Sequence, residues 1–545
     1  MKFGFVIDNR KCIGCHACTT ACKSEHDVPV GVFRTWVKQV EKGDFPHTRR
    51  VFSVMRCNHC TDAPCVDICP VEALYIRPDG IVDFDKNRCI GCKSCMQACP
   101  YDALYIDPET HTAAKCNYCA HRVDVGLEPA CVNVCPEHAI ISGDMDNPNS
   151  EISQLLGREL VTVRKAEKGT NPNLFYINGD HASLNPTATE KSDTTLWGAQ
   201  VRGVGHFAKD TEKLAFDGPD LITAAMASNG TSTTHSELKN INGGFKSVDV
   251  LMGKNRRVYD TPNKGILWGW EVSGYVWTKA IAAGAFLVAF LKELFLGNEV
   301  ASTSMFGDWM PVASLISLVF LAITGALLVK DLDQPKRFLN VLFRPQWKSW
   351  LVKGGYSITI YGGLLTLIFA SYLFDWSSFL PVLKWMAAAS AIFTAIYTAF
   401  LFAQAKGRDF WQSPSLAIHM FVHSIMAGAA IFALFGYNTD FGNNIAVFIR
   451  TVLYVSIAVN LITLFFEITT PHPTSDSKMV VDMITKGRYK NNFWFGAILL
   501  GNIIPVILMF SGFNGALTIA GTLVLAGIFI TEKIWVEAPQ RIQLS

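Results

Sequence analysis

All 16 cysteines of this 545-residue chain lie within its first 135 residues, where they fall into four groups of four. The first and third groups share the spacing C-x2-C-x2-C-x3-C, whereas the middle gap widens to four residues in the second group and to eleven in the fourth. The group members are, in chain order, Cys12, Cys15, Cys18, Cys22; Cys57, Cys60, Cys65, Cys69; Cys89, Cys92, Cys95, Cys99; and Cys116, Cys119, Cys131, Cys135.

Cysteines at this spacing are typical ligands of iron–sulfur clusters. In the bacterial [4Fe-4S] pattern, three close cysteines bind one cluster and the fourth binds its neighbour. Structural zinc uses pairs of C-x2-C, and disulfides belong to oxidising compartments. Neither accounts for the proline that directly follows the last cysteine in three groups (Pro70, Pro100, Pro136). The sequence therefore predicts four [4Fe-4S] clusters, with a zinc-rich scaffold on a membrane anchor as an alternative.

A repeat around these cysteines predicts how they are positioned. "CPVEALYI" begins at Cys69, "CPYDALYI" at Cys99 and a looser copy, "CPEHAIIS", at Cys135. Proline ends a short helix, "ALYI" then begins a strand, and "RPDG" followed by "IVDFD" predicts a turn and a returning strand. We expect an α+β ferredoxin-like double unit. The second and third groups would form one two-cluster unit, inserted between the first and fourth groups, which would form the other.

The remainder of the chain predicts a membrane domain. Eight apolar stretches of about 20 residues suit bilayer-spanning helices, so we expect an all-α eight-helix transmembrane bundle. The stretches are 272–295, 311–330, 355–374, 379–404, 416–437, 445–468, 492–510 and 513–532. The expected domains are 1–175 (iron–sulfur), 176–265 (a polar extended linker, packed on a partner subunit) and 266–545 (membrane).

The charge distribution indicates sidedness. With eight spans, the head and the C-terminus lie on one side, and the Lys and Arg residues of the short loops lie on that side too. The positive-inside rule then places the head in the cytoplasm of a prokaryotic cell, with the periplasm as the alternative. The first residues, "MKFGFVIDNRKC", show no secretory signal. A net charge of +2 gives no reason to expect a nucleic-acid partner.

The head resembles a known family. "CIGCHACTTACKSEHDVP", "RCNHCTDAPCVDICPVEAL", "CIGCKSCMQACPYDA" and "KCNYCAHRVDVGLEPACVNVCPEHAI" are similar to the four-cluster subunit of dimethyl-sulfoxide-reductase-type molybdoenzymes. The resemblance implies a molybdopterin-containing catalytic partner and four ligand sets. These are set A (Cys12, Cys15, Cys18, Cys135), set B (Cys22, Cys116, Cys119, Cys131), set C (Cys57, Cys60, Cys65, Cys99) and set D (Cys69, Cys89, Cys92, Cys95).

The tail, from about 262 to 545, also has a family likeness. "LLVKDLDQPKRFLNVLF", "FFEITTP" and "GRYKNNFWFGAILLGNIIPVILM" resemble the eight-helix polysulfide-reductase membrane-anchor family. The likeness implies electron exchange with a membrane quinone beside the iron–sulfur subunit. In many relatives that subunit is a separate chain facing the periplasm, so the likeness does not settle sidedness here.

Quinone chemistry moves protons as well as electrons, and ionisable residues within spans are candidates for that role. The candidates on the head side are Asp331, Lys279, His419, His423 and Glu467. The alternative is that these residues have a structural role only: Asp331 would pair with Lys336 or Arg337, and Lys279 would extend its amine towards water. The two histidines lie four apart on one helix and do not supply haem ligands from facing helices, so no haem is expected.

The predicted function is an electron-transfer and membrane-anchor subunit of a respiratory molybdopterin oxidoreductase, with substrate chemistry on a partner chain. The alternative is a membrane module in which redox chemistry drives ion or proton translocation. Such a module needs a polar path to the far side, where the candidates are Asp375, Lys384, Asp440 and Arg450. These four residues are also compatible with a simple interfacial position.

Overall fold

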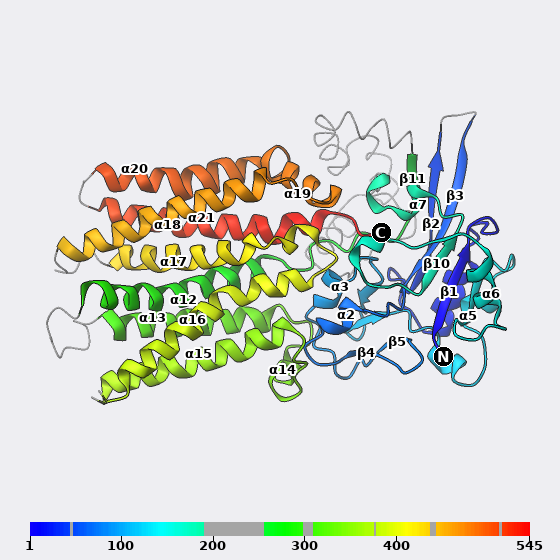
Figure 1. Cartoon of the computed structure of the whole chain (residues 1–545), viewed down its shortest axis with the longest axis horizontal. Coiled ribbons are helices and arrows are strands. Elements are labelled where there is room, and N and C mark those ends of the chain that lie inside the picture. Colours follow the sequence, from blue (N-terminus) through cyan, green and yellow to red (C-terminus); the bar gives the residue numbers. More distant parts are fainter. Residues whose placement is uncertain are drawn as a thin grey trace, which may run out of the picture.

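The computed structural model describes residues 1–43, 47–189, 255–297, 309–374, 376, 378–435, 443–511 and 515–545. Figure 1 shows a molecule of two parts. Strands and short helices form the cysteine-rich head, and long, roughly parallel helices form the other half. The C-terminus lies at the junction of the two.

The head is built on two sheets and two hairpins. The first sheet has the strand order β8-β1-β10-β9 and the second β11-β2-β3, while β4 pairs with β5 and β6 with β7. The strands are β1 (Phe3–Asp8), β2 (Thr35–Lys42), β3 (Arg49–Arg56), β4 (Leu74–Ile76), β5 (Val82–Phe84), β6 (Leu104–Ile106), β7 (Ala113–Lys115), β8 (Ile140–Asp144), β9 (Val161–Thr162), β10 (Leu174–Ile177) and β11 (Asn255–Tyr259). The short helices are α1 (Ala17–Glu25), α2 (Pro64–Asp67), α3 (Ser94–Ala98), α4 (Ala120–Val123), α5 (Ala130–Asn133), α6 (Glu151–Arg158) and α7 (His181–Leu184).

The repeated sequence forms repeated structure. Both "ALYI" segments are strands, and each pairs antiparallel with the strand that follows it. The turn in "RPDG" has Gly80 at φ +80°, a conformation that glycine adopts without strain. The strand after the third copy, β8, instead pairs antiparallel with β1 at the start of the chain. Residues on both sides of the middle cysteine groups therefore meet in one sheet.

The ordered head extends beyond residue 175. Strand β10 continues to Ile177, and β11, inside the expected linker, pairs with β2 in the second sheet. The buried guanidinium of Arg257 in β11 donates hydrogen bonds to the main-chain oxygens of Pro186 and Ser545. These flanks of the expected 176–265 linker thus pack on this chain itself. The prediction that the linker packs on a partner subunit concerns mostly residues 190–254, which lie outside the described residues.

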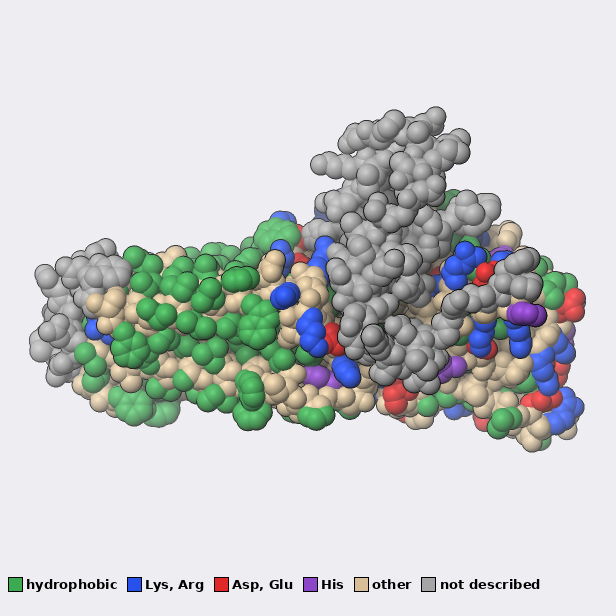
Figure 2. Space-filling view, turned by 90° about the horizontal axis from the view of Figure 1, so that it is seen from above, with side chains coloured by type: hydrophobic (Ala, Val, Ile, Leu, Met, Phe, Trp, Pro, Cys, Tyr) green, Lys and Arg blue, Asp and Glu red, His purple; other side chains and the backbone are tan. Residues whose placement is uncertain are grey.

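Seven helices in the described part of the chain are long and apolar enough to cross a membrane. They are α13 (Trp309–Lys330), α15 (Trp350–Leu373), α16 (Leu380–Gln404), α17 (Ser415–Phe435), α18 (Asn443–Thr469), α21 (Ala516–Glu537), and a π-helical segment (Asn492–Ile503) that continues as α20 (Ile504–Ser511). An eighth long helix, α12 (Trp270–Leu296), packs among them and is buried from Val272 to Ala289 except at Trp277. Apolar side chains cover this half of the molecule in Figure 2, and charged ones gather on the head.

The head is docked on the bundle by specific polar contacts. The connection after α13 runs along the loop of set D, where the main-chain N–H groups of Asp333 and Gln334 donate to Gly91 and Ile90. The short helix α14 (Asn340–Phe343) follows this connection. Nearby, Gln97 of α3 donates to Gln540 at 2.6 Å and accepts from the buried Arg408 at 2.9 Å. Head and bundle therefore share one buried polar interface at this point.

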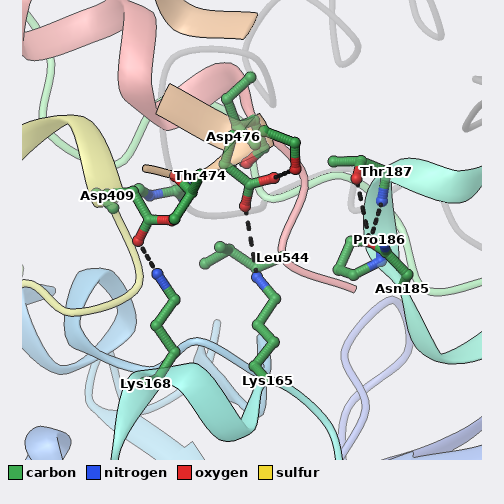
Figure 3. A network of polar contacts seen from close by, with 12 residues as sticks. Lys165, Lys168, Asn185, Pro186, Thr187, Asp409, Thr474, Asp476 and Leu544 are labelled. Carbon is green, nitrogen blue, oxygen red and sulfur yellow. Dashed lines mark hydrogen bonds and ion pairs between the residues drawn. The ribbon is translucent and has the colours of Figure 1, made fainter. Parts of the chain in front are cut away.

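A second junction is made by two lysines of the head, shown in Figure 3. Lys165 lies 3.8 Å from Asp476, in the first turn of α19 (Ser475–Thr485), and Lys168 pairs with Asp409. Burial lowers the pKa of Lys165 to about 8, although Asp476 opposes the shift. Lys165 thus places a charge at the interface that is costly to bury.

Substitutions at this junction should have unequal effects. We expect Asp476→Asn to lower the stability of the junction by roughly 2 kcal/mol, because Lys165 stays buried without its partner, whereas Lys165→Met should be neutral or stabilising. The ion pair exists only while folded Lys165 is charged, and its pKa in the folded protein is about 8, so the Asp476→Asn defect should be full well below pH 8 and should be lost as pH rises through 8. Unfolding temperatures of the detergent-purified protein test this, and equal losses in both variants would contradict it.

Candidate functional site: four cysteine sets and a membrane cavity

The structure brings the cysteines together in the four combinations A to D. Set A lines one cavity together with Pro136, set C lines a second, and set D lines a third beside Pro70. Cys22 of set B lies within electrostatic range of Cys116, Cys119 and Cys131. In each set one cysteine comes from a different group of the sequence, so strand and helix pairing, rather than spacing alone, completes the set.

The surroundings of the sulfur atoms fit iron–sulfur clusters. Main-chain N–H groups point at the sulfurs of Cys69 (from Ala73, 3.3 Å), Cys89 (from Gly91 and Ala113, both 3.4 Å) and Cys135 (from Ala139, 3.2 Å). Such bonds are among the features that set cluster potentials. Burial raises the pKa of the Cys57 thiol to about 11, so a thiolate there needs a compensating cation. Iron would supply that charge.

Two buried cations lie between the sets. Arg56 donates from Nη1 to the sulfur of Cys131 in set B at 3.1 Å, and it is within electrostatic range of Cys18 in set A. Lys115 donates from Nζ to the carbonyl of Cys116 at 2.9 Å and is within range of Cys57 in set C. Both side chains are fully buried. Each therefore places a positive charge beside two neighbouring sets.

A cavity of about 190 Å³ joins set D to the bundle. Its wall includes Cys92 and Ser94 from the head, Tyr275 from α12, Tyr397 from α16 and Asp331 after α13, and it is otherwise mainly apolar. The indole N–H of Trp268, also in the wall, donates to the carbonyl of Cys92 at 3.2 Å. A ligand in this cavity would lie beside a cysteine of set D, among membrane helices.

Of the five ionisable candidates, Asp331 lies in the wall of this cavity. The ammonium of Lys93, next to Cys92, donates to the main-chain oxygen of Asp331 at 2.9 Å and lies 3.9 Å from its carboxylate. Burial raises the pKa of Asp331 to about 7, with Lys93 opposing the shift. The alternative expectation was that Asp331 pairs with Lys336 or Arg337. The structure instead places Lys93 beside Asp331, and Arg337 donates to the carbonyls of Lys86 and Cys89.

Lys279 lies behind the cavity wall. Its ammonium is 4.6 Å from the ring centroid of Tyr397 and donates to Ala395 O at 3.0 Å and to Thr398 Oγ1 at 2.6 Å. The side chain is buried in the bundle and does not reach water. Lys279 therefore contacts one residue of the cavity wall, Tyr397.

The remaining three predicted residues form a separate cluster around Glu532 of α21. His419 and His423 on α17 contact Glu467 and Glu532 respectively, and all four side chains are buried. Sequence reasoning missed Glu532, although it is the last residue of the expected span 513–532. It also missed Arg56, Lys115, Tyr275 and Tyr397, whose positions follow from tertiary packing and not from a local pattern.

On the far side, the structure pairs one expected residue with a carboxylate. Lys384 of α16 donates to both carboxylate oxygens of Glu293 on α12, at 2.8 and 2.7 Å. Arg450 lies in the second turn of α18. Asp375 and Asp440 lie outside the described residues.

The fold and the cysteine sets define an iron–sulfur electron-transfer protein joined to a multi-pass membrane anchor. Comparison with known families agrees: residues 260–540 match the polysulphide reductase, NrfD, family, and residues 11–73 and 48–145 match 4Fe-4S dicluster domains. The chain belongs to the polysulphide reductase NrfD family, with a 4Fe-4S dicluster head fused to its N-terminal side.

Three relatives are similar to the head. A subunit of the tetrathionate reductase of Salmonella typhimurium is 44% identical over 200 residues, 36% of this chain and 80% of that protein. One of the polypeptides of the polysulfide reductase of Wolinella succinogenes is 42% identical over 181 residues, 32% of this chain and 94% of that protein. The putative dimethyl sulfoxide reductase iron-sulfur subunit of Halobacterium salinarum is 38% identical over 225 residues, 36% of this chain and 86% of that protein. Each of these three relatives is named as a subunit of a reductase.

Proposed function

We propose that this chain is the electron-transfer and membrane-anchor subunit of a respiratory molybdopterin oxidoreductase. It would pass electrons between a catalytic partner and membrane quinone through four [4Fe-4S] clusters held by sets A to D. The observation that carries the quinone assignment is the cavity lined by both Cys92 and Asp331. Its wall is mainly apolar and includes residues of the membrane helices, so a quinone bound there would lie beside a proposed cluster ligand. The clusters would supply one-electron transfer.

The chain's own residues would position the quinone and handle its protons. The phenols of Tyr275 and Tyr397 and the indole of Trp268 form an aromatic wall suited to a planar ring. Asp331, with a pKa near neutrality, can hold a proton or release it beside that ring. Lys93 orients the Asp331 segment through its bond to the main-chain oxygen. We limit the proposed quinone chemistry to this cavity. Lys279, in contact with Tyr397, is the second candidate for proton transfer there.

The architecture we propose is two ferredoxin-like units and eight spans. Pairing of β1 with β8 supports a unit made by the first and fourth cysteine groups, with the other unit inserted between them. The length and central position of α12 support counting it as a span in addition to the seven apolar helices. With eight spans, the Lys and Arg residues of the head-side loops favour a cytoplasmic head on the inner membrane of a prokaryote.

Substrate catalysis would take place on a partner chain that holds molybdopterin. Support comes from the three relatives described above, whose names place them in tetrathionate, polysulfide and dimethyl sulfoxide reductases. An oxyanion, polysulfide or sulfoxide is accordingly the class of substrate that we propose for the complex. This chain would connect that partner to the quinone pool.

Metal analysis of the purified protein tests the scheme. We expect about 16 irons per chain, because each of the four cysteine sets would hold one four-iron cluster, with interacting [4Fe-4S] signals in electron paramagnetic resonance of the reduced protein. Mass spectrometry of co-purified chains should find a large molybdopterin protein. Zinc in the cysteine sets in place of iron would refute the electron-transfer function, whereas iron without a molybdoprotein would refute only the proposed partner.

A second candidate function is redox-driven proton translocation. The partly buried Lys384–Glu293 pair favours it, because a charged pair between α12 and α16 on the far side from the head provides one polar group that such a path requires. We expect proton movement across sealed vesicles during quinone turnover to be lost in Lys384→Met if this function operates. Turnover without any transmembrane proton movement in the unmodified protein would exclude it.

A further inference from the structure

Two histidines and two glutamates meet inside the bundle, and none of the four lines the cavity beside Cys92. His419 and His423 lie one turn apart on α17, Glu532 lies on α21 and Glu467 on α18. Potential ligand atoms of His419, His423 and Glu532 all lie within 4.8 Å of one another. Their side chains are at most 2% exposed. The group thus has the composition and the compactness of a small metal site.

The hydrogen bonds leave nitrogen atoms of this group unused. Glu532 Oε1 lies 2.6 Å from Nδ1 of His423 and 3.9 Å from Nε2 of His419. The Nε2 atoms of both histidines are buried and have no hydrogen-bond partner among the described residues. Buried polar atoms in folded proteins nearly always have a partner. Two such atoms in one place therefore call for a ligand.

Glu467 orients His419 in the manner of a metal-ligating histidine. Nδ1 of His419 lies 3.0 Å from Glu467 Oε2, and Glu467 in turn accepts from the hydroxyl of Ser415 at 2.9 Å and the indole N–H of Trp535 at 3.2 Å. With its proton on Nδ1, His419 directs the lone pair of Nε2 towards Glu532. Carboxylates that fix the tautomer of a ligand histidine in this way are a regular feature of metal sites.

A metal-free group of ion pairs explains the arrangement less well. The ring centroids of the two histidines are 4.2 Å apart, so protonating both rings to match the two carboxylates would place two cations in contact. With neutral rings, the carboxylates leave negative charge in the bundle, which Lys279 offsets in part. A divalent cation would bind to the free lone pairs and balance this charge.

We propose that His419, His423 and Glu532 bind a first-row divalent cation, Zn²⁺ or Fe²⁺, with Glu467 as the residue that positions His419. Two imidazoles and one carboxylate form a ligand set that both ions accept. The ion would connect α17 directly to α21, and through Glu467 to α18. The site is distinct from the cysteine sets and from the proposed quinone cavity, so it does not depend on the proposed function.

The test is metal analysis of the full-length, cluster-loaded protein. The variant is Glu532→Gln, and the matched control is Glu537→Gln, a carboxylate on the same helix that instead accepts from the hydroxyl of Tyr489. We expect one zinc per chain in the unmodified protein and in the control, and less than about one fifth of that in the variant. Zinc K-edge absorption should show nitrogen and oxygen ligands with an imidazole pattern.

If the bound ion is Fe²⁺, Mössbauer spectroscopy distinguishes it from the iron of the clusters. A high-spin ferrous component outside the clusters, present in the control and lost in Glu532→Gln, would support the site with Fe²⁺ as its ion. Sulfur ligands around zinc, a metal content unchanged by Glu532→Gln, or the absence of both metals from the unmodified protein would each overturn the proposal. The absorption measurement needs only the unmodified protein, so it decides the zinc case even if the variant fails to fold.

Discussion

Replacing Asp331 by asparagine is expected to slow electron transfer to quinone by roughly 100-fold, the scale of general acid–base catalysis. Among the described residues, Asp331 is the one carboxylate in the wall of the cavity that Cys92 also lines. Asparagine preserves its size but cannot exchange a proton. Iron content and cluster spectra should stay unchanged, because Asp331 is not one of the proposed cluster ligands.

The pKa of Asp331 predicts how the rates of quinone reduction and quinol oxidation depend on pH. Burial raises the pKa of Asp331 to about 7, so the carboxyl group is protonated below that pH and ionised above it. Quinone reduction uses the protonated form as donor and should therefore slow as pH rises through 7. Quinol oxidation uses the ionised form as acceptor and should accelerate over the same range. Both profiles should flatten in Asp331→Asn.

The rate can be measured without the catalytic partner. The purified chain is reduced with dithionite, excess reductant is removed, and reoxidation by a soluble quinone analogue is followed through the cluster absorption. Glu537→Gln is the matched control, because Glu537 ends α21, accepts from the hydroxyl of Tyr489 at 3.1 Å, and does not line the cavity. Unchanged reoxidation in Asp331→Asn, or an equal loss in the control, would remove Asp331 from the proton transfer.

Local sequence patterns predicted the parts of this molecule that local forces determine. The "ALYI" strands, the glycine turn at Gly80 and the apolar helices all follow from residue type and periodicity within a short window. The expected span limits differ from the observed helices mostly by a few residues, because helices extend into the polar interface where hydropathy falls. The seventh span is unusual in beginning as a π-helix over Asn492–Ile503, for which hydropathy gives no signal.

Residues that act through long-range contacts were less predictable. Five ionisable groups were expected near one quinone pocket. Asp331 lies in the wall of the cavity beside Cys92, whereas His419, His423 and Glu467 gather with Glu532. Lys279 contacts Tyr397 of that wall and also lies within electrostatic range of Glu532. Strand β11 falls within the expected linker because the surrounding stretch is rich in Asn, Thr, Gly, Ser and charged residues and shows little periodicity. Its pairing with β2 joins residues more than 200 positions apart, and Arg257 is also bonded to Ser545 at the end of the chain.

Arg56→Gln is the second substitution for which we expect a large effect, a fall in the reduction potentials of the clusters bound by sets A and B. Arg56 is buried, with its guanidinium 3.1 Å from the sulfur of Cys131 and 4.5 Å from the ring centroid of Phe5. Its positive charge favours the reduced, more negative cluster. At an effective dielectric constant of about 20, a unit charge on the order of 5 Å away contributes roughly 3 kcal/mol, or on the order of 100 mV for one electron.

Redox titration followed by electron paramagnetic resonance measures this effect directly, and its pattern identifies the cause. Arg56→Gln should shift the two clusters nearest to it and leave the cluster of set D unchanged, because distance and intervening protein screen the charge. Arg56→Lys retains the charge and should restore most of the potential, whereas Lys115→Gln should instead shift the clusters of sets B and C. A uniform shift of all four clusters, or an equal shift in Arg56→Lys, would mean that packing and not charge is responsible. If the specific pattern is observed, buried cations between the sets control how readily electrons move along the chain of clusters towards the membrane.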